Sequence, residues 1–216
     1  MSTRIVLADD HAMLREMLAE HLAAEPDMEV VAVVPSAAAA LEAVLADSPD
    51  LVVLDIDMPG LCPFHVARRI HAERPATRVV FLSAYLRDHY VQQALDASAA
   101  GYLVKDETPE AIVQGLRMAA RGRTAFSPAV RARLSIGRDG VTFSGASGTR
   151  LALLTPRETE TLRYLASGLS RKEIARTMGI SNKTVEQHCE HLMHKLDIHD
   201  RVELTRFAIR EGLLEP

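Results

Sequence analysis

Aromatic residues are scarce in this sequence. It has no tryptophan, and aromatics make up only 4% of the chain, although the hydrophobic fraction reaches 48%. Any hydrophobic core must therefore be built mainly from Ala, Leu, Val and Ile. The length of 216 residues suits two domains, because a domain typically takes roughly 100–200 residues.

Cysteines and long apolar runs are also few. Cys62 and Cys189 lie far apart without CxxC spacing, which argues against a disulfide framework or a zinc finger and favours a reducing compartment. No apolar run approaches the roughly 18 residues of a membrane-spanning helix. The N-terminus enters a predicted strand without a signal peptide. We therefore expect a soluble cytoplasmic protein without a membrane partner.

The net charge of −4 is unevenly distributed. Residues 1–123 carry 11 Lys/Arg and 18 Asp/Glu, residues 124–150 carry four and one, and residues 151–216 carry ten of each. The acidic first part does not resemble a nucleic-acid surface. We predict a first domain over 1–123, a linker over 124–150 and a second domain over 151–216.

The predicted linker is rich in glycine and slightly basic. It contains four glycines between residues 137 and 148, and the pair Asp139-Gly140 is a turn signal. Val141-Thr142-Phe143 suits a short strand. Apart from that strand, the composition favours a flexible connector.

Apolar strand patterns and helix patterns alternate along the first domain. Strands are predicted at residues 5–8, 30–34, 51–54, 79–82 and 102–104, and helical spacing separates them, as at Leu14, Met17, Leu18 and Leu22. Such alternation predicts a parallel sheet with helices on both faces. We therefore predict a doubly wound α/β domain with a five-stranded parallel sheet.

Acidic residues follow two of these strands. Asp55 ends the apolar run 51–54 just before the strand-breaking Pro59-Gly60, and Asp9-Asp10 follows the run 5–8. In open α/β sheets the ligand site lies at the carboxyl ends of the strands, so Asp55 is placed like a reactive group. Carboxylates gathered there repel each other and favour a hard cation such as Mg²⁺. Singly, either acid is explained equally well as a strand end or a helix cap.

A hydroxyl and an amine follow two further strands. Ser83 follows the run 79–82, and Lys105 follows the run 101–104. Acids, one lysine and one hydroxyl together suit phosphoryl transfer to a carboxylate, in which the acid is the nucleophile and the cations neutralise the transferred oxygens. A lone Ser or Lys at a strand end is usually a turn or solvated residue, so the prediction depends on all four strand ends.

Residues 4–123 resemble the flavodoxin-like receiver domain of two-component response regulators. The resemblance lies in Asp9-Asp10, in Asp55-x-x-Met58-Pro59-Gly60, in Ser83 and in Gly101-Tyr102-Leu103-Val104-Lys105-Asp106. It differs in the loop after Gly60, where Leu61-Cys62-Pro63-Phe64 replaces a stretch that often holds a second glycine. This difference leaves the shape of the loop open.

The resemblance implies a role for each matching residue. Asp55 would accept phosphate from a histidine kinase. Mg²⁺ would bind Asp9 or Asp10, together with Asp55 and the backbone carbonyl of Asp57. Ser83 and Tyr102 would be the switch pair, and Lys105 would be the phosphate partner.

An enzyme of another class shares part of this pattern. Asp55-x-Asp57 after an apolar strand also resembles the nucleophile motif of haloacid-dehalogenase-type phosphatases. That family usually continues with Gly-Thr or a similar small pair, whereas Met58-Pro59 follows here, and an acidic pair ends the first strand. We therefore predict a receiver and not an enzyme.

Helix-start signals recur at short intervals in the second domain. Capping boxes begin at Thr155 and Ser170, and Ser181 and Asp200 are cap residues of two further helices. The pattern predicts an all-α domain of four helices. The turn over 178–181 would join two of them as a helix-turn-helix, with Asn182–Leu196 as the helix that enters the DNA major groove.

This pattern resembles the LuxR-type DNA-binding domain. The matching residues are Leu154-Thr155-Pro156-Arg157-Glu158, Gly168-Leu169-Ser170-x-Lys172-Glu173-Ile174-Ala175, Thr184-Val185, His188 and Lys195-Leu196. With the receiver, the chain resembles response regulators of the NarL/FixJ type. The resemblance implies a transcription regulator whose partners are double-stranded DNA, RNA polymerase and, after phosphorylation, a second copy of the chain.

The predicted recognition helix departs from this family at two positions. Glu186 and Glu190 stand where basic residues are common, and carboxylates oppose the phosphate contacts that dominate affinity for DNA. Glu accepts from cytosine and Gln187 pairs with adenine, so specific readout remains open. An alternative function also remains open, in which phosphorylation controls the action of this regulator on a partner protein instead of on DNA. The expected DNA-facing residues are Arg171, Lys172, Arg176, Lys183, Thr184, Glu186, Gln187, Glu190 and Lys195.

Overall fold

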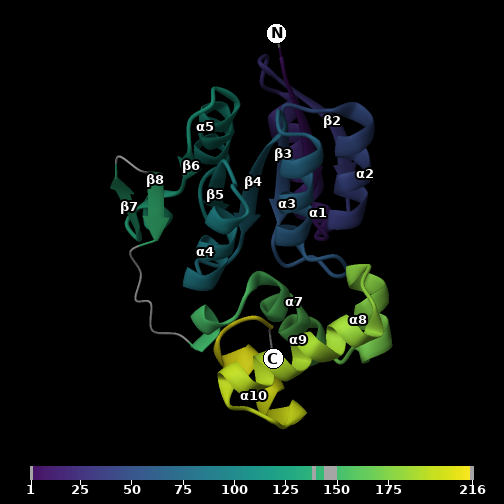
Figure 1. Cartoon of the computed structure of the whole chain (residues 1–216). Coiled ribbons are helices and arrows are strands. Elements are labelled where there is room, and N and C mark those ends of the chain that lie inside the picture. Colours follow the sequence, from purple (N-terminus) through teal and green to yellow (C-terminus); the bar gives the residue numbers. More distant parts are fainter. Residues whose placement is uncertain (1, 138–139, 144–149, 215–216) are drawn as a thin grey trace. The chain divides into compact units, whose positions relative to one another are not determined.

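The computed structural model describes residues 2–137, 140–143 and 150–214. The chain divides into two compact units, Met1–Ser144 and Gly145–Pro216. The helices and strands of both units are labelled in Figure 1. The domain bounds predicted from the sequence, 1–123 and 151–216 with a linker over 124–150, remain a prediction.

The first unit is built on one parallel sheet, as predicted. Neighbouring strands follow the order β2-β1-β3-β4-β5-β6, and every neighbouring pair is parallel. The strands are β1 (Thr3–Ala8), β2 (Met28–Val34), β3 (Leu51–Asp55), β4 (Arg78–Ser83), β5 (Gly101–Val104) and β6 (Ala125–Phe126). The doubly wound α/β class is confirmed.

The prediction of five strands is wrong, because β6 adds a sixth strand beside β5. Ala125 N donates to Ala100 O at 2.8 Å, and Ser127 N donates to Tyr102 O at 3.0 Å. Gly101 permits this close approach, since a Cβ there would lie 2.2 Å from the carbonyl oxygen of Ala125. Two residues are too few to show a strand periodicity in the sequence.

Helices cover both faces of the sheet (Figure 1). One face packs against α1 and α5, whose Leu18, Leu22 and Leu116 share a core with Leu7 and Val53. The opposite face packs against α3 and α4, where aromatic rings meet, and α2 contacts α3. The helices are α1 (Ala12–Ala23), α2 (Ala37–Asp47), α3 (Pro63–Glu73), α4 (Asp88–Asp96) and α5 (Pro109–Ala120).

The loop after Gly60 leads directly into α3. Cys62 is the N-cap residue of this helix and Pro63 takes its first position, where the missing N–H of proline is no loss. The Phe64 ring then packs against the Phe81 ring of β4, with 4.8 Å between the ring centroids. The residues that depart from the receiver pattern therefore start a helix and fill the core beside it.

Much of the predicted linker has regular structure. Besides β6 it contains the short helix α6 (Pro128–Arg131) and an antiparallel pair, β7 (Leu134–Gly137) and β8 (Gly140–Phe143). The predicted strand 141–143 lies in β8. The predicted turn at Asp139-Gly140 and the glycines at 145 and 148 fall wholly or partly outside the described residues.

The second unit has the four predicted helices, preceded by the 3₁₀ turn η1 (Arg150–Leu153). The helices are α7 (Pro156–Ala166), α8 (Arg171–Met178), α9 (Asn182–Leu196) and α10 (Arg201–Arg210). Both predicted capping boxes form, at Thr155 and Ser170, and Ser181 and Asp200 cap α9 and α10. Gly179 ends α8 at a φ of 65°, a left-handed conformation that glycine adopts without strain. Ile174, Val185 and Leu192 help form the buried core.

Candidate functional site

Four strand ends bring the predicted receiver residues to one edge of the sheet. Asp9 follows β1, Asp55 ends β3, Ser83 ends β4 and Lys105 follows β5. All four strands run parallel, so their carboxyl ends meet at this edge. Asp9, Asp55 and Ser83 are at most 1% exposed. The site is thus a group of buried polar side chains from distant parts of the sequence.

Lys105 lies between the two buried carboxylates. Its Nζ atom is 2.6 Å from Asp9 Oδ2 and 3.2 Å from Asp55 Oδ2. The ammonium group offsets part of the repulsion between these acids. Because Asp10 also belongs to this cluster, one lysine does not neutralise the whole acidic group.

The environment of Asp55 opposes its ionisation. Burial raises the pKa of Asp55 to about 6, and the charge of Asp9 adds to the rise, whereas Lys105 lowers the pKa. The backbone N–H of Ile56 donates to Asp55 Oδ1 at 2.8 Å, which leaves Oδ2 facing Lys105. At neutral pH the carboxylate is therefore available as a nucleophile, but its charge is costly to bury.

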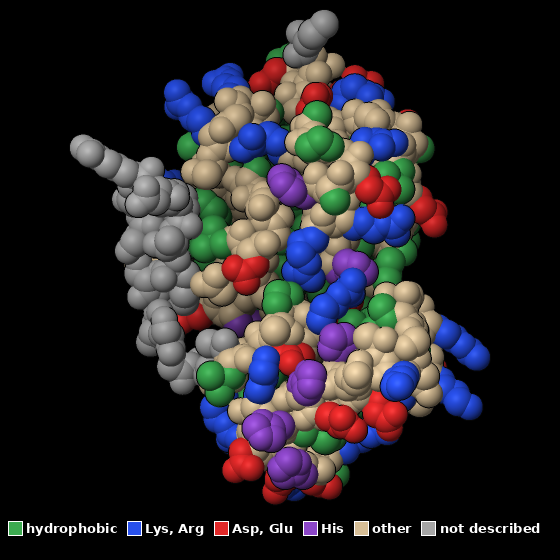
Figure 2. All heavy atoms as spheres, viewed as in Figure 1, with side chains coloured by type: hydrophobic (Ala, Val, Ile, Leu, Met, Phe, Trp, Pro, Cys, Tyr) green, Lys and Arg blue, Asp and Glu red, His purple; other side chains and the backbone are tan. Residues whose placement is uncertain are grey.

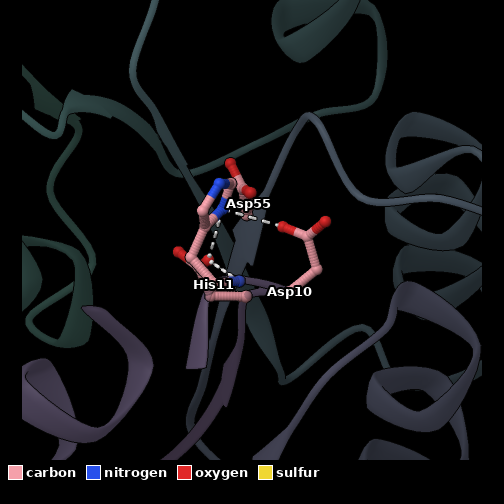
Figure 3. Close-up of side chains that lie close together, drawn as sticks. Asp10, His11 and Asp55 are labelled. Atoms are coloured by element: carbon pink, nitrogen blue, oxygen red, sulfur yellow. Dashed lines mark hydrogen bonds and ion pairs between the residues drawn. The ribbon is translucent and has the colours of Figure 1, made fainter. Parts of the chain in front are cut away.

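The acidic cluster fits a divalent cation. Ligand atoms of Asp9, Asp10, His11 and Asp55 all lie within 4.8 Å of one another. Figure 3 shows Asp10, His11 and Asp55 converging on one space. Several carboxylate oxygens with an excess of negative charge suit Mg²⁺. Asp57 stands apart from this group, and its Oδ2 atom is buried without a hydrogen-bond partner in the described part of the chain.

His11 and Tyr90 contact the predicted site residues but were missed in the sequence. His11 Nδ1 lies 3.0 Å from Asp10 Oδ1, and the His11 backbone N–H donates to Asp9 Oδ1 at 2.9 Å. The buried Tyr90 hydroxyl, from α4, donates to Asp57 Oδ1 at 3.0 Å. His11 directly follows the acidic pair, a signal that was available. Nothing in the sequence near Tyr90 marks its contact, which joins residues 33 positions apart.

Ser83 and Tyr102 hold the loop between β4 and α4 at one residue. Ser83 Oγ accepts a hydrogen bond from Tyr85 N at 3.1 Å, and the Tyr102 hydroxyl donates to Tyr85 O at 2.6 Å. Burial raises the pKa of Tyr102 despite a hydrogen bond with Ser83, so this hydroxyl stays a donor. Both residues of the predicted switch pair therefore bind the backbone of the same loop residue, Tyr85.

The surface of α9 carries both signs of charge. Lys183, Glu186, Gln187 and Glu190 are exposed, and Thr184 is half-buried. On the face shown in Figure 2, acidic, basic and histidine side chains are interspersed over the second unit. The two glutamates predicted to oppose DNA are thus accessible to solvent.

Glu186 is paired with another predicted DNA-facing residue. Its Oε1 atom lies 3.1 Å from Arg171 Nη1, and both side chains are about half exposed, at 52% and 51%. Arg171 is the first residue of α8. The pair reduces the net charge that either residue presents, while Lys172 and Arg176 on the same helix remain exposed.

Lys195 has a structural partner. Its Nζ atom lies 2.7 Å from Oε2 of Glu158, a side chain that is nearly buried and whose Oε2 also accepts from Thr155 N at 2.7 Å. Burial alone would raise the pKa of Glu158, but the hydrogen bonds from Lys195 and Thr155 outweigh it and hold the pKa below its usual range. Lys195 therefore joins α9 to the start of α7.

Family models match most of the chain. Residues 5–117 match the response regulator receiver domain, and residues 152–208 match the bacterial regulatory proteins of the luxR family. Among the described residues, no helix is both long and apolar enough to cross a membrane.

Whole-length relatives carry regulatory names. The oxygen regulatory protein NreC of Staphylococcus carnosus is 32% identical over 215 residues, which cover 98% of this chain and 99% of NreC. The probable transcriptional regulatory protein NarL of Mycobacterium tuberculosis H37Rv is 34% identical over 216 residues, which cover 98% of this chain and 96% of NarL.

Solved structures agree with these relatives. The response regulator ChrA of a haem-sensing two-component system has a TM-score of 0.53, 30% identity and 99% coverage of both chains. RcsB of Salmonella enterica bound to promoter rprA has a TM-score of 0.71 over 96% of this chain and 98% of RcsB, and at 20% identity it supports the fold alone. The family consists of regulatory transcription factors and not of enzymes. The chain belongs to the NarL/LuxR family of response regulators, which are DNA-binding transcription regulators with a receiver domain and a LuxR-type helix-turn-helix domain.

Proposed function

We propose that a histidine kinase phosphorylates this regulator on Asp55 and that phosphorylation controls its binding to double-stranded DNA. The observation that supports this most is the position of Asp55, buried at the carboxyl end of β3 beside Lys105 and the acidic cluster. Asp9, Asp10 and Asp55, with the backbone carbonyl of Asp57, would hold Mg²⁺. The ion would neutralise the oxygens of the transferred phosphoryl group.

Asp55 Oδ2 is the proposed nucleophile. It forms a bond to phosphorus as the bond between phosphorus and the kinase histidine breaks, and the product is an acyl phosphate. Lys105 is 3.2 Å from this oxygen, so its ammonium group is placed to pair with the new phosphoryl oxygens. The lysine would then exchange part of its contact with Asp9 for the phosphate.

The switch starts from contacts at Tyr85. A phosphoryl group on Asp55 attracts the Ser83 hydroxyl as a donor, and Ser83 then gives up its contact with Tyr85 N. The Tyr102 side chain is already fully buried, so the switch requires only that its hydroxyl follows Ser83 and releases Tyr85 O. The loop between β4 and α4 thereby loses two hydrogen bonds and takes a second arrangement.

The second unit would read DNA through α9. The N-terminal residues of the second helix of a helix-turn-helix lie nearest the base edges, and Lys183, Thr184 and Gln187 occupy that part of α9. Two copies of the phosphorylated chain would bind half-sites about one helical turn apart. Bound DNA would bring the regulator to RNA polymerase.

Phosphorylation by acetyl phosphate distinguishes the proposed acceptor, Asp55, from its neighbour Asp57. The full chain would be treated with acetyl phosphate and Mg²⁺ and analysed by intact and peptide mass spectrometry. We expect a phosphoryl adduct on wild type and on Asp57→Asn, and its loss in Asp55→Asn. Labelling that survives in Asp55→Asn and disappears in Asp57→Asn would reassign the acceptor.

The DNA part of the proposal needs its own measurement. Protein activated with acetyl phosphate would be used to select duplexes from a random library, with Asp55→Asn as the matched control. Enrichment of one paired motif by the activated wild type alone is expected. If the activated protein enriches no duplex, the alternative of a regulator that docks on a partner protein becomes the better account.

A further inference from the structure

The segment that follows the receiver helices is tied back to the first unit. We call residues 125–133 the tail segment; it comprises β6, Ser127, α6 and the two residues after α6. Ala125, Phe126 and Val130 are buried, and β6 pairs with β5. Further along the chain, β8 contacts α4. The tail segment is therefore a packed part of the first unit and the last described helical stretch before the chain leaves it.

Ser127 attaches the tail segment to the last residue of β5 and to the loop between β5 and α5. Its Oγ atom accepts from Val104 N at 3.0 Å and donates to Glu107 Oε2 at 2.7 Å. Ser127 is 2% exposed, so water does not replace these hydrogen bonds easily. Val104 and Glu107 stand on either side of Lys105, one and two positions away. A displacement of Lys105 therefore also shifts Val104 and Glu107, the two hydrogen-bond partners of Ser127.

Arg133 attaches the other end of the tail segment to the loop between β4 and α4. Its Nη1 atom pairs with Asp88 Oδ1 and donates to Leu86 O at 3.4 Å. Tyr85, next to Leu86, is the residue whose backbone holds both Ser83 and Tyr102. The guanidinium of Arg133 and the hydroxyl of Tyr102 thus bind carbonyls of adjacent residues.

The two attachment points coincide with the two loops that the proposed switch moves. One loop contains Lys105, which pairs with Asp9 and Asp55, and the other contains Tyr85. We propose that the tail segment carries the phosphorylation state out of the receiver, with Ser127 and Arg133 as the positioning residues that couple it to these loops. The inference is based on the function proposed above and adds the route by which it is transmitted.

Amide hydrogen exchange of the full chain tests this route. Peptides covering 84–88 and 125–133 would be followed by mass spectrometry with and without acetyl phosphate, in wild type, Arg133→Ala and Ser127→Ala. In wild type, phosphorylation is expected to change exchange in both regions. In Arg133→Ala the change in 84–88 persists while the change in 125–133 falls by roughly two- to fivefold, the scale of one exposed ion pair.

A second readout separates coupling from loss of structure. Arg133→Ala removes only a partly exposed side chain, so it is expected to fold even if the buried Ser127→Ala does not. Its labelling on Asp55 should equal that of wild type, while the ratio of DNA affinities with and without phosphorylation falls by roughly two- to fivefold. The matched control is Arg121→Ala, an exposed arginine of the same unit, which should leave this ratio unchanged.

Failure of the inference is distinguishable from failure of the proposed function. If wild type is not labelled on Asp55, the proposed function is wrong. If labelling is normal but exchange in 125–133 does not respond in wild type, or responds equally in Arg133→Ala, the tail segment is not the route.

Discussion

At the scale of single residues, Asp55 combines two opposing requirements. As a nucleophile it must be ionised, but its burial raises its pKa to about 6, so the folded protein tolerates the charge only at a cost. Lys105 reduces this cost from 3.2 Å away. The site therefore holds stored electrostatic repulsion at neutral pH, which a metal ion or a phosphoryl transfer would reduce.

Asp55→Asn is expected to stabilise the metal-free protein at neutral pH. The folded-state pKa of about 6 lies above the ordinary value for an aspartate, so the native state binds this proton more tightly than the unfolded state does. The free energy of unfolding therefore falls as the pH rises from about 4 to about 6. Removing the charge should raise it by about 1–3 kcal/mol at pH 7.5 and by little at pH 4.

Thermal or denaturant unfolding in a chelating buffer at both pH values measures this effect. Asp106→Asn, which changes an exposed carboxylate on the same loop as Lys105, is the control and should show no such pH dependence. Equal stability of Asp55→Asn and wild type at pH 7.5 would contradict the account of Asp55 as a costly buried charge.

At the scale of elements, α9 shows how neighbouring helices modify a sequence pattern. In the sequence, Glu186 and Glu190 look alike as acids on a helix expected to face phosphates. In the structure, Glu186 pairs with Arg171 of α8, while Glu190 is exposed on α9. The two glutamates should therefore differ in how strongly they oppose DNA.

Replacing both glutamates by lysine tests whether they face DNA. The double variant Glu186→Lys with Glu190→Lys should raise affinity for random duplex by about tenfold. It should also steepen the slope of log affinity against log salt by about 1–2, which corresponds to about one to two additional phosphate contacts. Glu190→Lys alone should supply most of this gain, because Arg171 already offsets the charge of Glu186. Fluorescence anisotropy over a salt series measures both quantities. A double variant that binds random duplex no better than wild type would place these side chains away from DNA.

At the scale of the whole molecule, pairing of two chains needs an apolar surface that the folded units leave open. Of the apolar residues near the C-terminus, Leu204, Phe207 and Leu213 are buried inside the second unit. Val202 of α10 is 59% exposed. Self-association through this helix would therefore centre on Val202 and not on its buried neighbours.

Val202→Arg is expected to weaken binding to a paired site without unfolding the second unit. Burying one valine contributes about 1.5–3 kcal/mol, and a charge in its place also opposes contact between copies. Affinity for DNA with two half-sites should fall about tenfold or more, by the relation of 1.4 kcal/mol to a factor of ten. Affinity for a single half-site should stay near that of wild type. Val33→Arg, at another exposed valine, is the control, and an equal loss in both variants would rule out α10 as the pairing helix.

Local sequence signals were enough to predict the features that depend on them. Apolar runs of three to five residues located five strands, and cap residues such as Thr155 and Ser170 located the helices of the second unit. The acidic and basic residues at the strand ends identified one edge of the sheet, because parallel strands must place their carboxyl ends together. These patterns need only neighbours a few residues apart.

The pairing of side chains across the fold could be seen only after the elements had been placed in space. The two-residue strand β6 exists because β5 offers an edge beside Gly101. Lys195, expected to face DNA, lies against the buried Glu158, and Ser127 and Arg133 reach loops 20 and 45 positions away. Such contacts join residues far apart in the chain, and their partners are selected by distance and burial after the elements have packed, so no local pattern records them.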